Sequence, residues 1–209
     1  MFDEEGNLIP PGPYFLEVAK KGKLYSEVTK ILFQKVLKKI RTHDCEISVN
    51  LSSLDIEDHS MSEYLLALLE KNRDITDKLI FELLEDKDTQ DYEYVNNFIN
   101  RARAFGVKIA IDDFGSGYSN FIRIIEFKPD IIKIDGSLIE DISNTESNRK
   151  TVEAINIFAQ TIGATTVAEY VTNKKTYEII DEIGIDYAQG FYIGKPELEL
   201  ITEKELELA

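Results

Sequence analysis

Six short stretches of this 209-residue chain are rich in β-branched and other apolar residues, and each ends in a polar residue that can bind a metal or a phosphate. A parallel strand that is buried on both faces is apolar along its length, so a charged group at its carboxyl end requires a specific reason. In a barrel of parallel strands, all these ends open on one rim. The pattern therefore predicts a metal-dependent site on that rim. The polar residues at the strand ends are Asn50, Glu82, Asp112 with Asp113, Lys133 with Asp135, Glu169 and Gln189.

Segments with helical periodicity lie between these predicted strands. In the first, residues 26–41, apolar side chains recur at spacings of three and four, which predicts one buried stripe. Three of the predicted helices end in glycine, a residue that caps a last turn in the left-handed conformation. Alternation of strand and helix predicts a parallel sheet. The other helical segments are residues 61–71, 95–105, 152–162 and 177–183, and the glycines are Gly106, Gly163 and Gly184.

The predicted fold class is α/β, a TIM-like (β/α) barrel. A closed barrel of this type has eight strands and about 250 residues, whereas the chain supplies six strands, so we expect an incomplete barrel in which the first two strands are missing. We expect residues 1–209 to form a single domain, because 43% of the chain is apolar and no change of composition divides it.

The charge balance limits the possible partners. The chain has 24 basic and 39 acidic residues, a formal charge of −15, which repels polyanions unless cations intervene, so duplex nucleic acid is not an expected partner. The N-terminus has no basic region followed by an apolar stretch, and no apolar run reaches the roughly 18 residues of a membrane span. We therefore expect no membrane segment and a cytoplasmic location. Cys45, the only cysteine, cannot form an internal disulfide.

Simpler interpretations of the polar residues stay open at this point. One aspartate of the Asp112–Asp113 pair could cap the following helix. Lys133 and Asp135 are two residues apart, so their side chains emerge on the same face and could form an internal salt bridge. Asn50 and Gln189 could belong to turns or loops. The recurrence of such a residue at the end of all six strands favours a shared site, since independent helix caps would not require it.

The ordered motifs resemble those of the EAL family of bacterial cyclic di-GMP phosphodiesterases. The resemblance extends over the chain from Gly6 onward, and its most specific part is the signature Asp-Asp-Phe-Gly-x-Gly-Tyr-Ser, which begins at Asp112. The remaining motifs that carry it are Asn50-Leu-Ser52, Glu82-Leu-Leu-Glu85, Lys133-Ile-Asp135, Ala168-Glu169, Gln189-Gly190-Phe191 and Lys195-Pro196.

The resemblance implies hydrolysis of cyclic di-GMP to linear di-guanylate at a two-metal site that holds Mg²⁺ or Mn²⁺. It also implies a homodimer, with an upstream sensory or GGDEF-type domain. The implied roles are metal binding for Asn50, Glu82, Asp112 and Asp113, catalysis for Lys133 and Glu169, substrate binding for Gln189 and Asp135, and anchoring of the Asp-Phe-Gly loop for Glu85.

The chain departs from the family pattern in several places. The Glu-Ala-Leu motif that names the family, whose glutamate binds metal, is not found in the sequence. Tyr170 and Thr172 stand where the family has glycine and a second acid, and Asn120 replaces a serine. These departures leave a second hypothesis, a catalytically inactive EAL-like receptor or regulatory interaction domain. A third, an unrelated metal-dependent barrel enzyme such as an enolase-like lyase, does not account for the Asp-Phe-Gly-x-Gly-Tyr-Ser loop.

Overall fold

A computed structural model describes residues 25–84, 91–116 and 121–197 of the chain. The chain divides into two compact units, Met1–Ile109 and Ala110–Ala209, and the boundary lies inside strand β3 (Lys108–Phe114). Among the helices described, none has the length and apolar character needed to cross a membrane.

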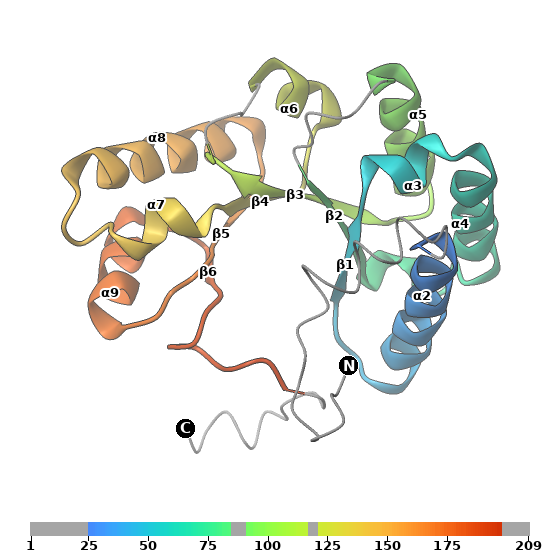
Figure 1. The fold of residues 1–209 in the computed structure, drawn as a ribbon, viewed down its shortest axis with the longest axis horizontal. Helices are drawn as coiled ribbons and strands as arrows, with labels where there is room; N and C mark the ends of the chain where they lie inside the picture. The colour runs from blue at the N-terminus through green and yellow to red at the C-terminus, as the bar shows by residue number, and fades with distance from the viewer. Residues whose placement is uncertain (1–24, 85–90, 117–120, 198–209) are drawn as a thin grey trace. The chain divides into compact units, whose positions relative to one another are not determined.

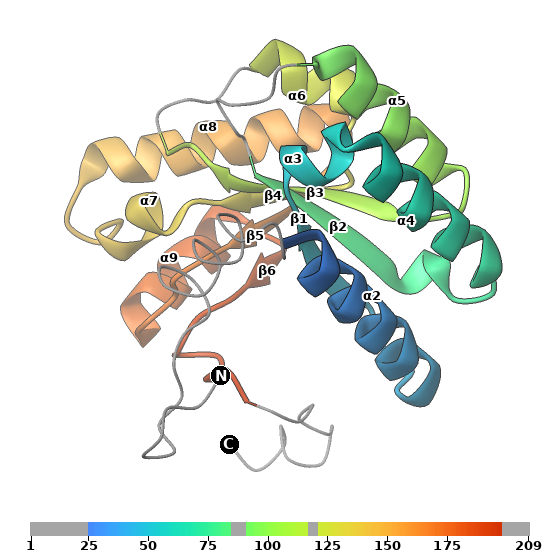
Figure 2. The same ribbon diagram turned by 45° about the vertical axis from the view of Figure 1, so that its right-hand side comes forward.

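The first unit packs helices against two parallel strands (Figures 1 and 2). In the register of these strands Asn50 lies opposite Glu82, so the two predicted metal ligands of this unit are neighbours. Phe81 is fully buried between Phe33, which it meets edge to face, and Phe98, on which it stacks. The elements are α2 (Tyr25–Thr42), β1 (Ile47–Leu51), α3 (Ser53–Glu57), α4 (His59–Lys71), the 3₁₀ helix η2 (Thr76–Lys78), β2 (Leu79–Leu84) and α5 (Tyr92–Arg103).

The second unit has four strands that lie in the order β3-β4-β5-β6, and every neighbouring pair is parallel. Helices α7, α8 and α9 flank the strands (Figures 1 and 2). Parallel neighbours require a crossover between successive strands, and a helix supplies it after β3, β4 and β5. After β3 the elements are α6 (Phe121–Phe127), β4 (Ile131–Ile134), α7 (Gly136–Glu140), α8 (Glu146–Ile162), β5 (Thr165–Ala168), α9 (Lys174–Ile183) and β6 (Tyr187–Ala188).

The predicted elements are confirmed. The six strands are present in the described residues, and the helical periods correspond to α2, α4, α5, α8 and α9. Gly163 and Gly184 cap α8 and α9 with φ of 77° and 84°, in the left-handed region where glycine carries no Cβ penalty. The same prediction for Gly106 was wrong, because α5 ends at Arg103 with Ala104 as its cap, and Gly106 lies in the turn that follows. Helices α3, α6 and α7 were not predicted, since five to seven residues are too few to establish a helical period.

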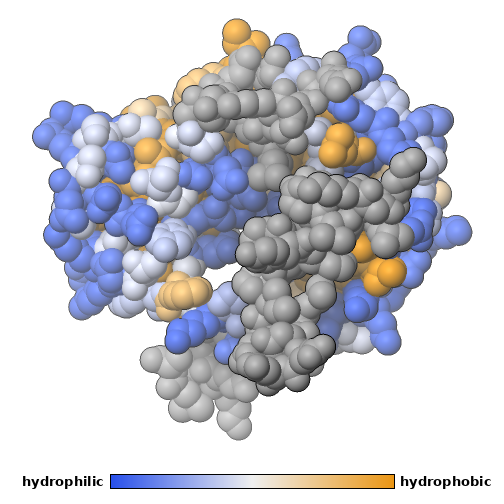
Figure 3. Space-filling view, viewed as in Figure 1, coloured by the Kyte–Doolittle hydropathy of each residue, from blue (hydrophilic) through white to orange (hydrophobic). Residues whose placement is uncertain are grey.

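Helix α6 has an exposed apolar face. Phe121, Ile122 and Ile125 are 48%, 71% and 51% exposed. Figure 3 shows hydrophobic residues at the surface at the top of the view, where this helix lies, and further hydrophobic residues among the hydrophilic ones elsewhere on the coloured surface. The ring of Phe121 also packs edge to face against the rings of Phe114 and Phe158, which attaches the start of α6 to β3 and α8. The helix is therefore fixed in place and presents isoleucine side chains to solvent.

A buried amide fastens α8 to the turn that follows α9. Asn156 is 4% exposed, and its Nδ2 donates to the carbonyl oxygens of Ile183 at 3.0 Å and Gly184 at 3.3 Å. Its Oδ1 accepts from the hydroxyl of Thr166 on β5. The carbonyls at a helix end have no partner within the helix, so the buried Asn156 amide supplies a donor to this end of α9.

We expect Asn156→Ala to lower the free energy of unfolding by about 2–3 kcal/mol, because it removes the hydrogen bonds of a buried side chain and creates a cavity. Chemical denaturation followed by circular dichroism measures this. The matched control is Asn148→Ala on the same helix, whose amide makes one exposed hydrogen bond of 3.3 Å to the Ser137 carbonyl, and which should cost less than about 1 kcal/mol. Equal losses in the two variants would contradict this role for Asn156.

Candidate active site

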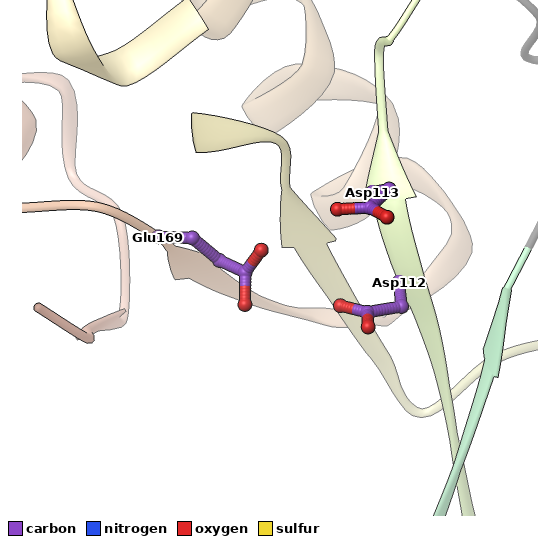
Figure 4. Close-up of side chains that lie close together, drawn as sticks. All are labelled: Asp112, Asp113 and Glu169. Atoms are coloured by element: carbon purple, nitrogen blue, oxygen red, sulfur yellow. The ribbon is translucent and has the colours of Figure 1, made fainter. Parts of the chain in front are cut away.

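The two neighbouring aspartates of β3 point the same way. In a regular strand adjacent side chains face opposite sides. Here the β3–β4 register shifts between Ile111 and Phe114, and Asp113 has φ of 53°. This irregularity turns the backbone, so Asp112 and Asp113 both face Glu169, which follows β5 (Figure 4). Each of the three carboxylates offers an oxygen within 4.8 Å of the others.

Lys133, on β4 between the other two strands, holds two of these carboxylates. Its Nζ lies 2.7 Å from Oδ1 of Asp112 and 2.7 Å from Oε1 of Glu169. The three side chains are only 8%, 13% and 18% exposed, so these ion pairs are poorly screened by solvent. The strand order fixes the arrangement: the central strand supplies the cation, and its neighbours supply the acids.

Two of the carboxyl groups have raised pKa values. Burial raises the pKa of Asp113 above its ordinary range, and the nearby charges of Asp112 and Asp135 raise it further. Burial likewise raises the pKa of Glu169, although the hydrogen bond from Lys133 opposes this effect. The raised pKa values of both groups mean that negative charge at the site is unfavourable, because one ammonium does not balance the surrounding acids.

The residues fit a divalent cation. Asp112, Asp113, Asp135 and Glu169 contribute four carboxyl groups around the single ammonium of Lys133. Carboxylate oxygens are hard ligands of the type that Mg²⁺ and Mn²⁺ prefer. A bound cation would relieve the repulsion that raises the pKa of Asp113, so the electrostatics and the ligand chemistry agree.

A cavity of about 650 Å³ adjoins these acids. Asp113, Glu169 and Gln189 contribute to its wall. Its volume lies within the range of roughly 300–1,000 Å³ that is typical of small-molecule and cofactor sites. Thus an acidic, cation-competent cluster lies beside a space that can hold a nucleotide-sized ligand.

The structure brings together part of the predicted set within the second unit. Asp112, Asp113, Lys133 and Glu169 converge, and Gln189 lines the same cavity. Asp135 caps α7, where its Oδ1 accepts from the backbone N–H of Ser137 at 2.9 Å, and it also lies close enough to Asp113 to raise that group's pKa.

The other predicted residues belong to the first unit or fall outside the description. Asn50 and Glu82 are opposite each other on β1 and β2. Glu85 and the end of the Asp-Phe-Gly-x-Gly-Tyr-Ser signature, residues 117–120, lie outside the described residues. The predicted roles of these residues stay predictions.

Several residues of the cavity wall were missing from the predicted set of site residues, and two of them lie next to the acids. Gly136 and Tyr170 both line the cavity. Gly136 follows the motif aspartate Asp135, and a glycine directly after a strand end was an available signal. Tyr170 was noted only as a departure from a family pattern, and its position in the wall required the fold.

The fold and the site define a parallel α/β protein of the barrel type with a cluster of acids, able to hold a cation, at the carboxyl ends of its strands. The model of the EAL domain family matches residues 1–196, and the chain belongs to this family. Its fold is accordingly the TIM-like barrel of EAL domains, and the resemblance identified in the sequence is confirmed.

Characterised relatives and solved structures agree with this assignment. The chain is 30% identical over 202 residues to the cyclic di-GMP phosphodiesterase PdeA of Borreliella burgdorferi, covering 94% of this chain and 30% of that protein. It is 31% identical over 212 residues to the cyclic di-GMP phosphodiesterase PdeF of Escherichia coli, covering 99% and 28%. The chain thus spans less than a third of the length of these relatives.

Among solved structures, the MucR phosphodiesterase in complex with c-di-GMP matches with a TM-score of 0.83 and 28% identity, over 93% of this chain and 80% of that one. The FimX EAL domain from Pseudomonas aeruginosa bound to c-di-GMP gives a TM-score of 0.84 at 22% identity, over 94% and 81%, and supports the fold alone.

Proposed function

We propose that this chain is a cyclic di-GMP phosphodiesterase domain that hydrolyses cyclic di-GMP to linear di-guanylate and depends on Mg²⁺ or Mn²⁺. The observation that carries the proposal is the placement of Lys133 between Asp112 and Glu169, with Asp113 at the wall of a nucleotide-sized cavity. The names of the similar proteins PdeA and PdeF, and the ligand in the MucR structure, support it.

The proposed ligand set follows the family resemblance: Asp112 and Asp113 of the acidic cluster, and Asn50 and Glu82, which lie opposite each other on β1 and β2. When bound, a pair of divalent cations would supply Lewis-acid activation of water and stabilisation of the departing oxygen. Without compensation by cations, the acidic wall would repel a ligand that carries two phosphodiester charges.

The remaining roles belong to the chain's own side chains. Lys133 donates hydrogen bonds at the centre of the site, where it can hold the attacking water and stabilise the charge that develops on phosphate. Burial raises the pKa of Glu169, which makes its carboxylate a stronger base and suits it to accept the proton of that water. Gln189 lines the cavity and can bind substrate oxygens with its amide.

The test is incubation of the chain with cyclic di-GMP and Mn²⁺, followed by chromatography of the nucleotides. We expect linear di-guanylate to accumulate, and chelation of the metal to abolish its formation. If the dinucleotide binds in calorimetry and is never hydrolysed, the chain is instead a receptor. Thr172, a neutral residue in the cavity wall where the family has an acid, favours this second candidate.

We also propose that the chain acts as one domain over residues 1–209 and works within a longer protein beside a sensory or GGDEF-type domain. The family match over residues 1–196 supports the single domain. The chain covers less than a third of the length of its curated relatives, which supports a longer protein around it. Its similarity in fold to the S helix-GGDEF-EAL structure of Vibrio cholerae LapD supports the same proposal.

We propose that the chain forms a homodimer through α6. Exposed isoleucine side chains on a helix anchored by Phe121 suit a self-complementary interface. We expect Ile122→Glu with Ile125→Glu to convert a dimer into a monomer in light scattering, because charges buried without partners are strongly unfavourable. Ile157→Glu on α8, at a position 65% exposed, is the control and should leave the mass unchanged. A monomeric unchanged chain would contradict the proposal.

A further inference from the structure

Tyr170, the residue directly after Glu169, adopts a backbone conformation that bulky residues rarely adopt. Its φ is 58°, in the left-handed region. Its side chain is 53% exposed and contributes to the wall of the 650 Å³ cavity. An exposed ring gains little from core packing, so stability does not account for a tyrosine here. Unfavourable backbone conformations of this type concentrate at ligand sites, where the surrounding structure enforces them.

Hydrogen bonds on both sides of Tyr170 hold this conformation. The N–H of Glu169 donates to the carbonyl of Ile134 at 3.3 Å, and the N–H of Val171 donates to the carbonyl of Gln189 at 3.0 Å. The residues on either side of Tyr170 are thus tied to the last residue of β4 and to the residue that follows β6. The backbone from which the ring extends is therefore held in place, which reduces the conformational entropy lost when a ligand packs against the ring.

Gly136 makes room for this tyrosine. A Cβ at position 136 would lie 2.8 Å from Cβ of Tyr170, closer than such atoms approach in proteins. Tyr170 and Gly136 line the same cavity as Glu169 and Asp113. An aromatic residue in an unusual backbone conformation is thus accommodated by a glycine, next to the acids of the candidate site.

We propose that the ring of Tyr170 is a stacking surface for a guanine base of the cyclic dinucleotide. This inference rests on the proposed function and names the side chain that binds a base of the substrate. In an acidic chain the phosphates gain affinity from bound metal ions and from a few lysines, such as Lys195 of the cavity wall, so neutral contacts are needed for the rest of the binding. Stacking of a base on an aromatic ring is such a contact, and it is insensitive to the charge of the wall.

The binding test uses a non-hydrolysable phosphorothioate analogue of cyclic di-GMP with Mg²⁺, measured by calorimetry. Tyr170→Leu should weaken binding by roughly 10- to 100-fold, and Tyr170→Phe should bind within about twofold of the unchanged chain, because stacking needs the ring and not the hydroxyl. Tyr187→Leu, at a tyrosine that is 66% exposed and outside the set lining the cavity, is the matched control and should bind normally.

Tyr170→Gly separates binding from folding. Glycine adopts positive φ without strain, so this variant should melt at the same temperature as the unchanged chain or higher, and still bind as weakly as Tyr170→Leu. The chain contains no tryptophan, so Tyr170→Trp adds a single tryptophan, whose emission can be excited apart from that of the tyrosines. Guanine stacking should quench its emission when the analogue is added, whereas the emission of Tyr187→Trp should not change.

The outcomes distinguish this inference from the proposed function. If the unchanged chain binds the analogue and Tyr170→Leu binds it equally well, the stacking role is overturned while the proposed function stands. If the unchanged chain does not bind the analogue with Mg²⁺, both are overturned. Weak binding by Tyr170→Leu and Tyr170→Gly, with normal binding by Tyr170→Phe, supports the inference.

Discussion

Replacing Lys133 with methionine is expected to lower the free energy of unfolding of the metal-free chain by about 3 kcal/mol, since it leaves the buried carboxylates of Asp112 and Glu169 without their cation. Hydrolysis of cyclic di-GMP should fall by at least about 100-fold, the typical loss when a charge-stabilising donor is removed from an active site. Denaturation and initial rates with Mn²⁺ measure the two effects.

The metal dependence of Lys133→Met gives a second readout. Loss of the ammonium makes the site more negative, so Mg²⁺ should raise the melting temperature of this variant more than that of the unchanged chain. The control is Lys108→Met, which removes an exposed ion pair with Glu46 and should cost less than about 1 kcal/mol. A Lys133→Met variant as stable and as active as Lys108→Met would contradict the central position of this lysine.

Asp113→Asn is expected to separate stability from metal binding. Burial and the charges of Asp112 and Asp135 raise the pKa of Asp113, so the folded chain binds this proton more tightly than the unfolded chain. The resulting stabilisation is complete below the unfolded pKa of about 3.9 and is lost as pH rises through the raised folded pKa. Near pH 7.5 the ionised group therefore opposes folding, and the metal-free variant should melt at a higher temperature.

The same substitution should weaken metal binding by at least roughly 10- to 100-fold. Removal of a residue that only orients a metal ligand already causes a loss of this size, and Asp113 is proposed as a ligand itself. Calorimetric titration with Mn²⁺ measures it. In the unchanged chain the affinity should also fall as pH decreases, because protons compete with the cation at a raised pKa. Asp181→Asn, at an exposed carboxylate of α9, should change neither property. A metal-free Asp113→Asn chain that is less stable than the unchanged one would contradict the proposed repulsion.

Periodicity sufficed to predict the long elements of the fold. Apolar stripes at spacings of three and four identified α2 and α8, because tertiary packing of one helix face requires them. The left-handed glycines Gly163 and Gly184 then marked where helices end. The short helices α6 and α7 escaped prediction, since they depend on contacts between distant residues, such as those of Phe121 with Phe158.

The site was predictable as a set of residue types and not as a geometry. The carboxyl ends of parallel strands indicated that Asp112, Lys133 and Glu169 would converge, as they do. That Lys133 pairs with acids on both neighbouring strands follows from strand order, which no local pattern encodes. The shared direction of Asp112 and Asp113 depends on a register shift and a positive φ at a non-glycine residue, which contradict the regular alternation of a strand.

The central claim is that the acidic cluster of Asp112, Asp113 and Glu169 is a divalent-cation site, in which Asp112 and Asp113 are ligands. The most direct measurement is an anomalous difference map from crystals of the chain grown with Mn²⁺, recorded at the manganese absorption edge. The account predicts a peak at about 2.0–2.3 Å from carboxylate oxygens of this cluster, and loss of that peak in Asp113→Asn. A manganese peak elsewhere, with none beside these three side chains, would contradict it.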